Sequence, residues 1–272
     1  MKALACAKVV LLPVLMAVAT SAWAAQNAPD AKAMVAKAVK TELDADHNDH
    51  SAFEYRDHDV TPDHDTVFQV IETPQGSLKR KLAEHGEPLS AEQRHVDDLR
   101  IHAFLNDPSV QARQKKDEVH DNQQAESMLK LLPVAFLWTV TKESPTEVTL
   151  NFTPDPAFNP KTMEARVLSA MSGEIVVARP SNRIQHLRGR LTQDVKIGFG
   201  LLGRLKAGGT FCVERREVAP GHWQITSSHV HIDGKALLFK SIGEQEDETK
   251  TDFKVSPSET LEQAALVLNE TH

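Results

Sequence analysis

The feature that most constrains the fold is a run from Ala135 to about Phe253 in which apolar and polar side chains alternate with a period of two. No helical pattern separates these segments, so consecutive strands are expected to pair directly, as in an antiparallel meander. Turn-forming residues interrupt the run at short intervals: Ser144-Pro145, Ser172-Gly173, Pro180-Ser181-Asn182, 219–222 and Asp233-Gly234. We expect about seven strands from this region in one large curved sheet.

Helices and a hairpin are expected outside this run. Residues 65–71 and 78–85 alternate around a Pro/Gly turn, which predicts a β-hairpin. The long polar stretch 90–132 begins with a capping-box pair and is broken at Asn106-Asp107-Pro108, which predicts two helices. Shorter amphipathic helices are predicted at 30–43, with Met34, Val35, Ala38 and Val39 on one side, and at 258–268, with Leu261, Ala264, Ala265 and Leu268 on one face.

Together these patterns predict an α+β protein. Its main element is a large curved antiparallel sheet, or half-open barrel, covered by helices and accompanied by a preceding β-hairpin and a long helical pair. We expect residues 25–272 to form one domain. The predicted segments are 1–24 as a signal peptide, 25–65 as the N-terminal helix and an Asp/His-rich linker, 66–89 as the hairpin, 90–132 as the helical pair, and 133–272 as the meander with its C-terminal helix.

The first 24 residues have the features of a secretory signal peptide. Lys2 and Lys8 flank the start of a short apolar run, and Ala22-Trp23-Ala24 provides the small-x-small pattern for cleavage near Ala24. We therefore expect a periplasmic or secreted protein. Its mature part would retain Cys212 alone, so no disulfide could form within the chain. The net charge of −7, which becomes −9 without Lys2 and Lys8, argues against nucleic acid as a partner.

The Asp/His-rich segment, which begins "DADHNDH" at Asp44, suggests a metal site at first sight. As a calcium loop it fails, because Asp49 stands where glycine is needed and Tyr55 where a bidentate glutamate is needed. A transition-metal site would need a packed shell around the histidines, and the sequence offers none. A solvated linker between a helix and a strand is the preferred interpretation, since Asp and Asn favour caps and turns.

Two further motifs each allow two interpretations. His229 and His231 lie two apart in a predicted strand, where two imidazoles can bind one ion, yet no third ligand can be named. The stretch "GFGLLG", from Gly198 to Gly203, matches a dinucleotide fingerprint but is not followed by the necessary helix. It either folds inward as core or forms an apolar flap that touches a lipid or a membrane surface.

Several stretches together carry a resemblance: "VFQVIETPQGSLKRKLAEHGEPLS", "MLKLLPVAFLW", "ARVLSAMSGEIVV", "GRLTQDVKIGFGLLGRLKAGGTF" and "REVAPGHWQITSSHVHIDGKALLFKSI". They resemble a family of uncharacterised exported bacterial proteins of the acidobacterial type. The order of elements is also similar to the LolA/RseB-type lipoprotein-sorting carriers, which implies a curved sheet whose apolar face is plugged by helices and binds acyl chains. No residue motif of those carriers occurs here, so none of their functional residues is transferred.

Our leading hypothesis is a non-enzymatic binding protein, a carrier or sensor of a lipid, acyl chain or lipoprotein, with transient contact to a membrane surface. We expect no catalytic residue, cofactor or metal. The alternatives are an exported metal-dependent hydrolase that uses His229 and His231, and an envelope scaffold that binds a protein through residues 90–132. The expected ligand-binding residues, which share apolar strand faces or the flap, are Val148, Leu150, Phe152, Phe199, Leu201, Leu202, Trp223 and Ile225.

Overall fold

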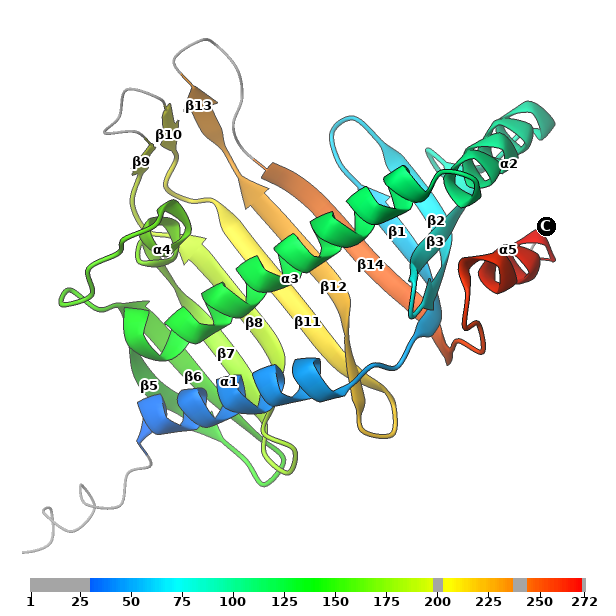
Figure 1. The fold of residues 1–272 in the computed structure, drawn as a ribbon. Helices are drawn as coiled ribbons and strands as arrows, with labels where there is room; N and C mark the ends of the chain where they lie inside the picture. The colour runs from blue at the N-terminus through cyan, green and yellow to red at the C-terminus, as the bar shows by residue number, and fades with distance from the viewer. Residues whose placement is uncertain (1–29, 198–202, 237–243, 271–272) are drawn as a thin grey trace, which may run out of the picture. The chain divides into compact units, whose positions relative to one another are not determined.

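The computed structural model describes residues 30–197, 203–236 and 244–270, and its main element is an 11-stranded antiparallel sheet. The order of the strands is β4-β3-β2-β1-β14-β12-β11-β8-β7-β6-β5, so the first and last strands along the sheet are not paired with each other. A second sheet, β13-β10-β9, has three short strands. The α+β class with a large, open antiparallel sheet and helices packed against it is therefore confirmed (Figure 1).

No helix among the described residues is long and apolar enough to span a bilayer.

The helices and strands have the following bounds in chain order. The elements are α1 Ala31–Asn48, β1 Phe53–Val60, β2 Asp65–Thr73, β3 Gly76–Glu84, β4 Glu87–Pro88, α2 Ala91–Leu105, α3 Pro108–Ala135, β5 Phe136–Glu143, β6 Glu147–Pro154, α4 Met163–Leu168, β7 Met171–Ala178, β8 Arg183–Leu191, β9 Val195–Ile197, β10 Gly203–Leu205, β11 Thr210–Ala219, β12 His222–Ile232, β13 Gly234–Ala236, β14 Glu244–Val255 and α5 Leu261–Asn269.

The helices cover the two faces of the large sheet unequally. On one face, here called the helix face, the main apolar core joins Leu150 of β6 and Ile175 of β7 to residues of α1, α3 and α4. On the opposite face, here called the outer face, α2 and α5 pack against Ile71 of β2 and Leu78 of β3. Figure 1 shows α3 as a long helix that runs across the sheet, with α1 beside β5 to β8. The outer face of the middle strands has no such helix among the described residues.

Most elements form where the sequence predicts them. Ile71 pairs with Leu78 in the β2-β3 hairpin, and the helical pair is interrupted at Asn106 and Asp107. Ser90 and Gln93 form the expected capping box at the start of α2. The buried residues of α5 are Leu261, Ala264, Ala265 and Leu268, the predicted apolar face.

Two expectations about local structure are wrong. The Asp/His-rich linker does not exist as such, because α1 continues to Asn48 and residues 53–60 form β1. Period-two alternation is present in β1, but Asp57 occupies one of its buried positions and hides the pattern. The stretch before β7 was expected to be strand, yet Met163–Leu168 form α4, whose start is capped by Thr162.

A buried ion cluster holds α1 to the helix face. Glu42 of α1 is only 3% exposed, and its carboxylate accepts hydrogen bonds from Arg183 Nε at 3.1 Å and from the backbone N–H of Ile184 at 2.6 Å. Arg215 of β11 forms a close ion pair with the same carboxylate. The guanidinium of Arg183 also lies 5.7 Å from the ring centroid of Trp223. Three elements are thus joined through one carboxylate.

Removing this carboxylate should cost much more stability than removing an exposed one. In Glu42→Ala two arginines are left in a poorly solvated site without their anion, and we expect a loss of about 3–5 kcal/mol in the free energy of unfolding. The matched control on the same helix is Lys40→Ala, which removes an exposed ion pair with Asp44 and should cost less than about 1 kcal/mol. Urea denaturation measures both values; equal losses would contradict the role of Glu42.

Candidate functional site

The polarity of the helix face changes along each row of side chains that crosses the sheet. Directly paired residues of antiparallel strands point to the same face, so the strand register defines these rows. The first row starts with four apolar residues and ends with four polar ones. From β6 to β2 it reads Leu150, Ile175, Leu187, Val213, Ser228, Glu248, Asp59 and Thr66. The change takes place between β11 and β12.

A second, parallel row shows the same change one strand later. It reads Phe152, Gly173, Gly189, Phe211, Val230 and Glu246 from β6 to β14. Both glycines are necessary, because a Cβ on Gly173 would lie 2.8 Å from Cζ of Phe152, and one on Gly189 would overlap the ring of Phe211. The two phenylalanine rings therefore lie over the glycines and complete the apolar surface. We call the apolar members of both rows, as far as Val230, the apolar half of the helix face.

The part of the apolar half on β6 and β7 is covered by helices, and several predicted ligand-binding residues are buried there. Val148, Leu150 and Phe152 are all buried, with α1 and the end of α3 contributing Val35 and Leu132 to the same cluster. An acyl chain could reach these three residues only if a covering helix moved. The strand residues nearer the middle of the sheet, Leu187, Phe211, Val213 and Val230, are only half-buried.

The other predicted binding residues lie in different surroundings. Trp223 and Ile225 are on β12 on the helix face, since Ile225 pairs with Arg215, which reaches Glu42. Ile225 is 39% exposed, and Trp223 lies beside Arg183. Phe199, Leu201 and Leu202 lie outside the described residues, so the expected flap cannot be placed.

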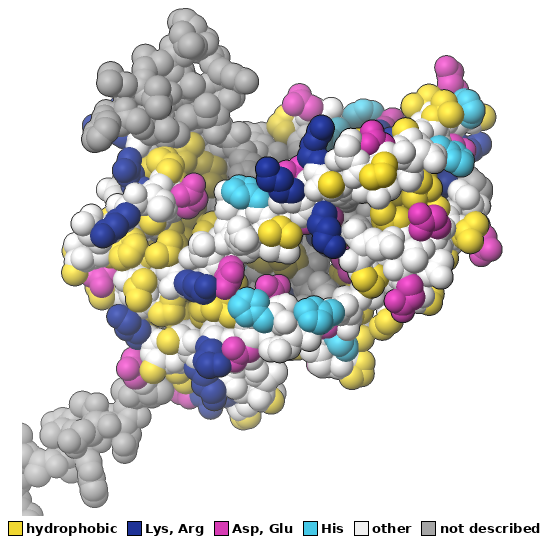
Figure 2. Space-filling view, viewed as in Figure 1, with side chains coloured by type: hydrophobic (Ala, Val, Ile, Leu, Met, Phe, Trp, Pro, Cys, Tyr) yellow, Lys and Arg dark blue, Asp and Glu magenta, His cyan; other side chains and the backbone are white. Residues whose placement is uncertain are grey.

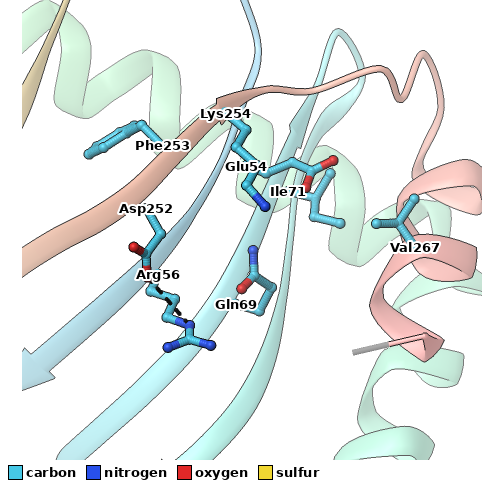
Figure 3. A pocket seen from close by; sticks show the side chains of 8 residues that line it. All are labelled: Glu54, Arg56, Gln69, Ile71, Asp252, Phe253, Lys254 and Val267. Carbon is cyan, nitrogen blue, oxygen red and sulfur yellow. Dashed lines mark ion pairs between the residues drawn. The ribbon is translucent and has the colours of Figure 1, made fainter. Parts of the chain in front are cut away.

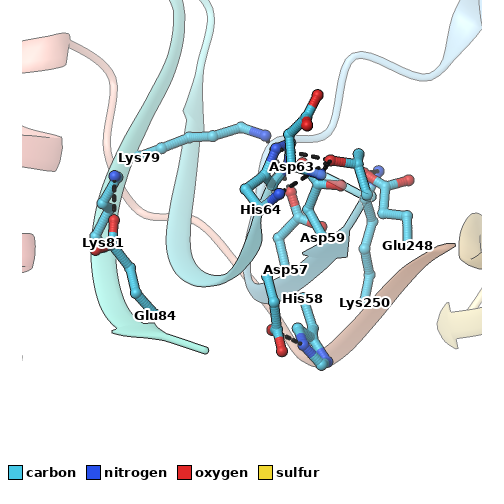
Figure 4. A network of polar contacts seen from close by, with 12 residues as sticks. Asp57, His58, Asp59, Asp63, His64, Lys79, Lys81, Glu84, Glu248 and Lys250 are labelled. Carbon is cyan, nitrogen blue, oxygen red and sulfur yellow. Dashed lines mark hydrogen bonds and ion pairs between the residues drawn. The ribbon is translucent and has the colours of Figure 1, made fainter. Parts of the chain in front are cut away.

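Beyond β12, the helix face carries a network of charged side chains (Figure 4). Asp57 is only 1% exposed, and its Oδ2 accepts a hydrogen bond from Lys79 at 3.0 Å. Asp59 lies 2.9 Å from His64, and Glu248 lies 3.1 Å from Lys250. We call Asp57, Asp59, Glu72 and Glu248 the carboxylate cluster. Within the described part of the chain, Oδ1 of Asp57 and Oδ1 of Asp59 are both buried without a hydrogen-bond partner.

Burial in this network shifts two pKa values. Desolvation raises the pKa of Glu72, although the backbone N–H of Phe53 donates a hydrogen bond to it at 2.9 Å. Desolvation, reinforced by Glu72 and Asp57, raises the pKa of Tyr55 well above its usual range. Both pKa values are raised, as expected where negative charge is poorly solvated. This part of the face therefore favours a cationic ligand.

Helix α3 passes over this face without packing closely on its middle strands. Near its start, Gln114 donates a hydrogen bond to the carbonyl of Ser77 at 3.1 Å, and near its end Leu132 is buried in the main core. In between, residues 119–125 are exposed on every side over about two turns, which is incompatible with close packing on a sheet. Below them, β11 and β12 contain no buried residue. Figure 2 shows the surface hollowed between α1 and α3.

Two cavities lie elsewhere on the molecule. The first, of about 390 Å³, is between the outer face and α5 (Figure 3), where Arg56 forms an ion pair with Asp252 at 3.7 Å. The second, of about 500 Å³, lies beside α4 and β9 and is lined by Arg166, Asp194 and Lys196 among others. Neither is lined by residues of the apolar half, and both have mixed polar and apolar walls.

The histidines of the Asp/His-rich segment are mostly paired singly with carboxylates. His47 lies 3.5 Å from Glu126 of α3, and His58 lies 2.8 Å from Asp65. Asp49, at the end of α1, lies 2.9 Å from His222 of β12. His229 and His231, the pair of the hydrolase hypothesis, lie on the outer face with ring centroids 5.2 Å apart, and His229 forms a close contact with Asp247. The segment does not bring a third ligand to them.

Two polar features of the helix face, the ion cluster of Glu42 and the carboxylate cluster, were not predicted from the sequence. Glu42 follows the apolar residues Val35, Ala38 and Val39 at helical spacing, so its position on the buried side of α1 was open to prediction. Its partners Arg183 and Arg215 come from distant strands and are fixed only by the register. The carboxylate cluster could have been found from the alternation of Asp57 and Asp59 with Arg56 and His58, had this stretch been assigned to a strand.

The raised pKa of Glu72 predicts a specific pH dependence of stability. An acid with a higher pKa in the folded state than in the unfolded state makes folding less favourable once the pH rises above the unfolded value. Glu72→Gln removes this cost, so its free energy of unfolding relative to the wild type should increase between pH 4 and pH 7. Urea denaturation at both pH values checks this, and a difference independent of pH would contradict it.

Comparisons with protein-family models, with curated proteins and with solved structures give no significant match to this chain. The resemblance to exported bacterial proteins and to lipoprotein-sorting carriers therefore stays a prediction. Two surfaces bear on the function, the apolar half of the helix face and the carboxylate cluster beside it.

Proposed function

We propose that this is an exported, non-enzymatic binding protein, a carrier or sensor that takes a lipid, an acyl chain or the acylated end of a lipoprotein on its helix face. The observation that carries this proposal is the change from apolar to charged side chains within single rows of that face. An amphiphile has the same change along its length. Its alkyl chain would lie over the apolar half, and its head group would lie at the carboxylate cluster.

The head group that fits this surface best is cationic. Asp57, Asp59, Glu72 and Glu248 outnumber Lys79 and Lys250 in the network, and two carboxylate oxygens are buried without a partner among the described residues. An ammonium group offers three donors and a positive charge to such oxygens. A buried carboxylate without its full set of hydrogen bonds costs stability, and this cost would be relieved by the ligand.

Binding requires α1 to leave part of the apolar half. The residues that α1 buries there, Val35, Ala38 and Val39, have small side chains, so replacing them by an alkyl chain restores most of the lost apolar contact. Each methylene that becomes buried contributes about 0.8 kcal/mol. The ion cluster of Glu42 opposes this movement, because it must be opened or rearranged. The net affinity is therefore moderate, as suits a protein that also releases its ligand.

A charge in the apolar half should abolish the binding of alkyl chains. Val230→Glu places a carboxylate beside Phe211, to which Val230 is paired, and should weaken binding of a fluorescent fatty acid by at least about tenfold. The matched control is Thr249→Glu, which places the same new charge on the outer face, since Thr249 of β14 is paired with Ser227 there. This variant should bind the fatty acid as the wild type does. Fluorescence titration of the folded variants measures both affinities.

Two outcomes would contradict the proposal. The first is equal weakening by both substitutions, which would place the binding site elsewhere or reduce the effect to lost stability. The second is the absence of co-purified lipid, measured by mass spectrometry of organic extracts from the wild-type mature protein, together with no binding of either lauric acid or dodecylamine. Competition then tests the head group: dodecylamine should displace the probe more strongly than lauric acid of equal chain length.

A further inference from the structure

A group of metal-binding side chains lies on the outer face, away from the surface proposed to take the amphiphile. His186 of β8 and Glu214 of β11 are directly paired, and Cys212 lies two residues before Glu214 on the same strand face. The Sγ atom of Cys212 lies 3.9 Å from Nδ1 of His186, and the same Nδ1 lies 3.9 Å from Oε1 of Glu214. Within the described ranges, these three form the only group of three or more such side chains whose ligand atoms all lie within 4.8 Å of one another.

These separations are close to those of a tetrahedral site. With bonds of about 2.0–2.3 Å to nitrogen, oxygen and sulfur, neighbouring ligand atoms of a zinc ion lie about 3.3–3.8 Å apart. The third pair, Sγ of Cys212 and a carboxylate oxygen of Glu214, lies within 4.8 Å, so side-chain movements of up to about 1 Å would close the site. The three residues are half-buried, so the ion would be reached from solvent and held against the paired strands β8 and β11.

The neighbouring strand offers a fourth ligand that is already oriented by a carboxylate. His229 of β12 is directly paired with Cys212, and its Nδ1 makes a close contact with Oδ1 of Asp247 on β14. A contact of this kind leaves Nε2 as the metal-binding atom, as in many carboxylate–histidine–zinc arrangements. His231 lies edge-on to His229, so it offers a second imidazole on the same surface.

We propose that the outer face binds one divalent transition-metal ion, with zinc the best fit, through His186, Cys212 and Glu214, and with His229 as the fourth ligand. A set of imidazole, thiolate and one carboxylate selects zinc or a similar borderline ion over magnesium and calcium, which prefer oxygen ligands alone. The ion would join β8, β11 and β12 at the strands where the helix face changes from apolar to charged.

Binding at this site releases a proton. Cys212 would bind the ion as a thiolate. When the metal–sulfur bond forms, the S–H bond breaks and its proton passes to water. Binding should therefore weaken as the pH falls.

Cobalt(II) tests the site directly, because it replaces zinc and gives a sulfur-to-metal charge-transfer absorption only when a thiolate is bound. Titration of the metal-free mature protein should produce this absorption with one equivalent of cobalt(II), and zinc should remove it. Cys212→Ser should abolish the absorption and weaken zinc binding at least about tenfold, while His229→Ala should weaken it less. The control is His58→Ala, which removes another outer-face histidine that is paired with Asp65.

The proposal is overturned if cobalt(II) gives no thiolate absorption, or if Cys212→Ser binds zinc as tightly as the wild type does. The latter result would assign any bound ion to other carboxylates and histidines, such as those of the Asp/His-rich segment. Circular dichroism of each variant checks that the fold is retained. We expect Cys212→Ser to fold as the wild type does, because the two side chains are similar in size.

Discussion

The arrangement of the helix face depends on one buried interaction, the carboxylate of Glu42 between Arg183 and Arg215. Helix α1 offers the sheet only small apolar side chains, and the apolar contact alone would leave it weakly held. The ion cluster fixes the position of α1 on the sheet, since a charge buried with its partners tolerates few alternative positions. It fixes α1 on β8 and β11, next to Trp223, and so determines which part of the apolar half is covered.

This covering gives the two halves of the sheet different properties. The strands from β5 to β8 are closed by a packed core, whereas β11, β12 and β14 lie beneath a stretch of α3 that is exposed on every side. A molecule that displaces α1 would gain apolar surface at one end and charged surface at the other. The carboxylate cluster is poorly solvated and incompletely hydrogen-bonded, so it favours a cation before any ligand is present. The same strands present histidines and Cys212 to solvent on their outer face.

The sequence was sufficient for the fold class because its signals are local. Alternation and turn residues predicted the meander, and the capping residues Ser90 and Gln93 located a helix start. The wrong expectations arose where tertiary contacts determine the structure. Asp57 is tolerated in a buried strand position only because Lys79 of another strand reaches it, and that contact leaves no trace in the sequence near Asp57. The predicted binding residues Val148, Leu150 and Phe152 are buried in the core beneath α1. The position of α1 depends on Glu42, Arg183 and Arg215, which are far apart along the chain.

The central claim is that α1 moves away when an amphiphile binds to the helix face. Hydrogen–deuterium exchange of the protein, with and without saturating dodecylamine, tests it most directly. The account predicts faster exchange of the amides of residues 31–48 in the presence of the amine, while β6 and β7 remain protected. Binding of the amine with unchanged or slower exchange in α1 would contradict the account.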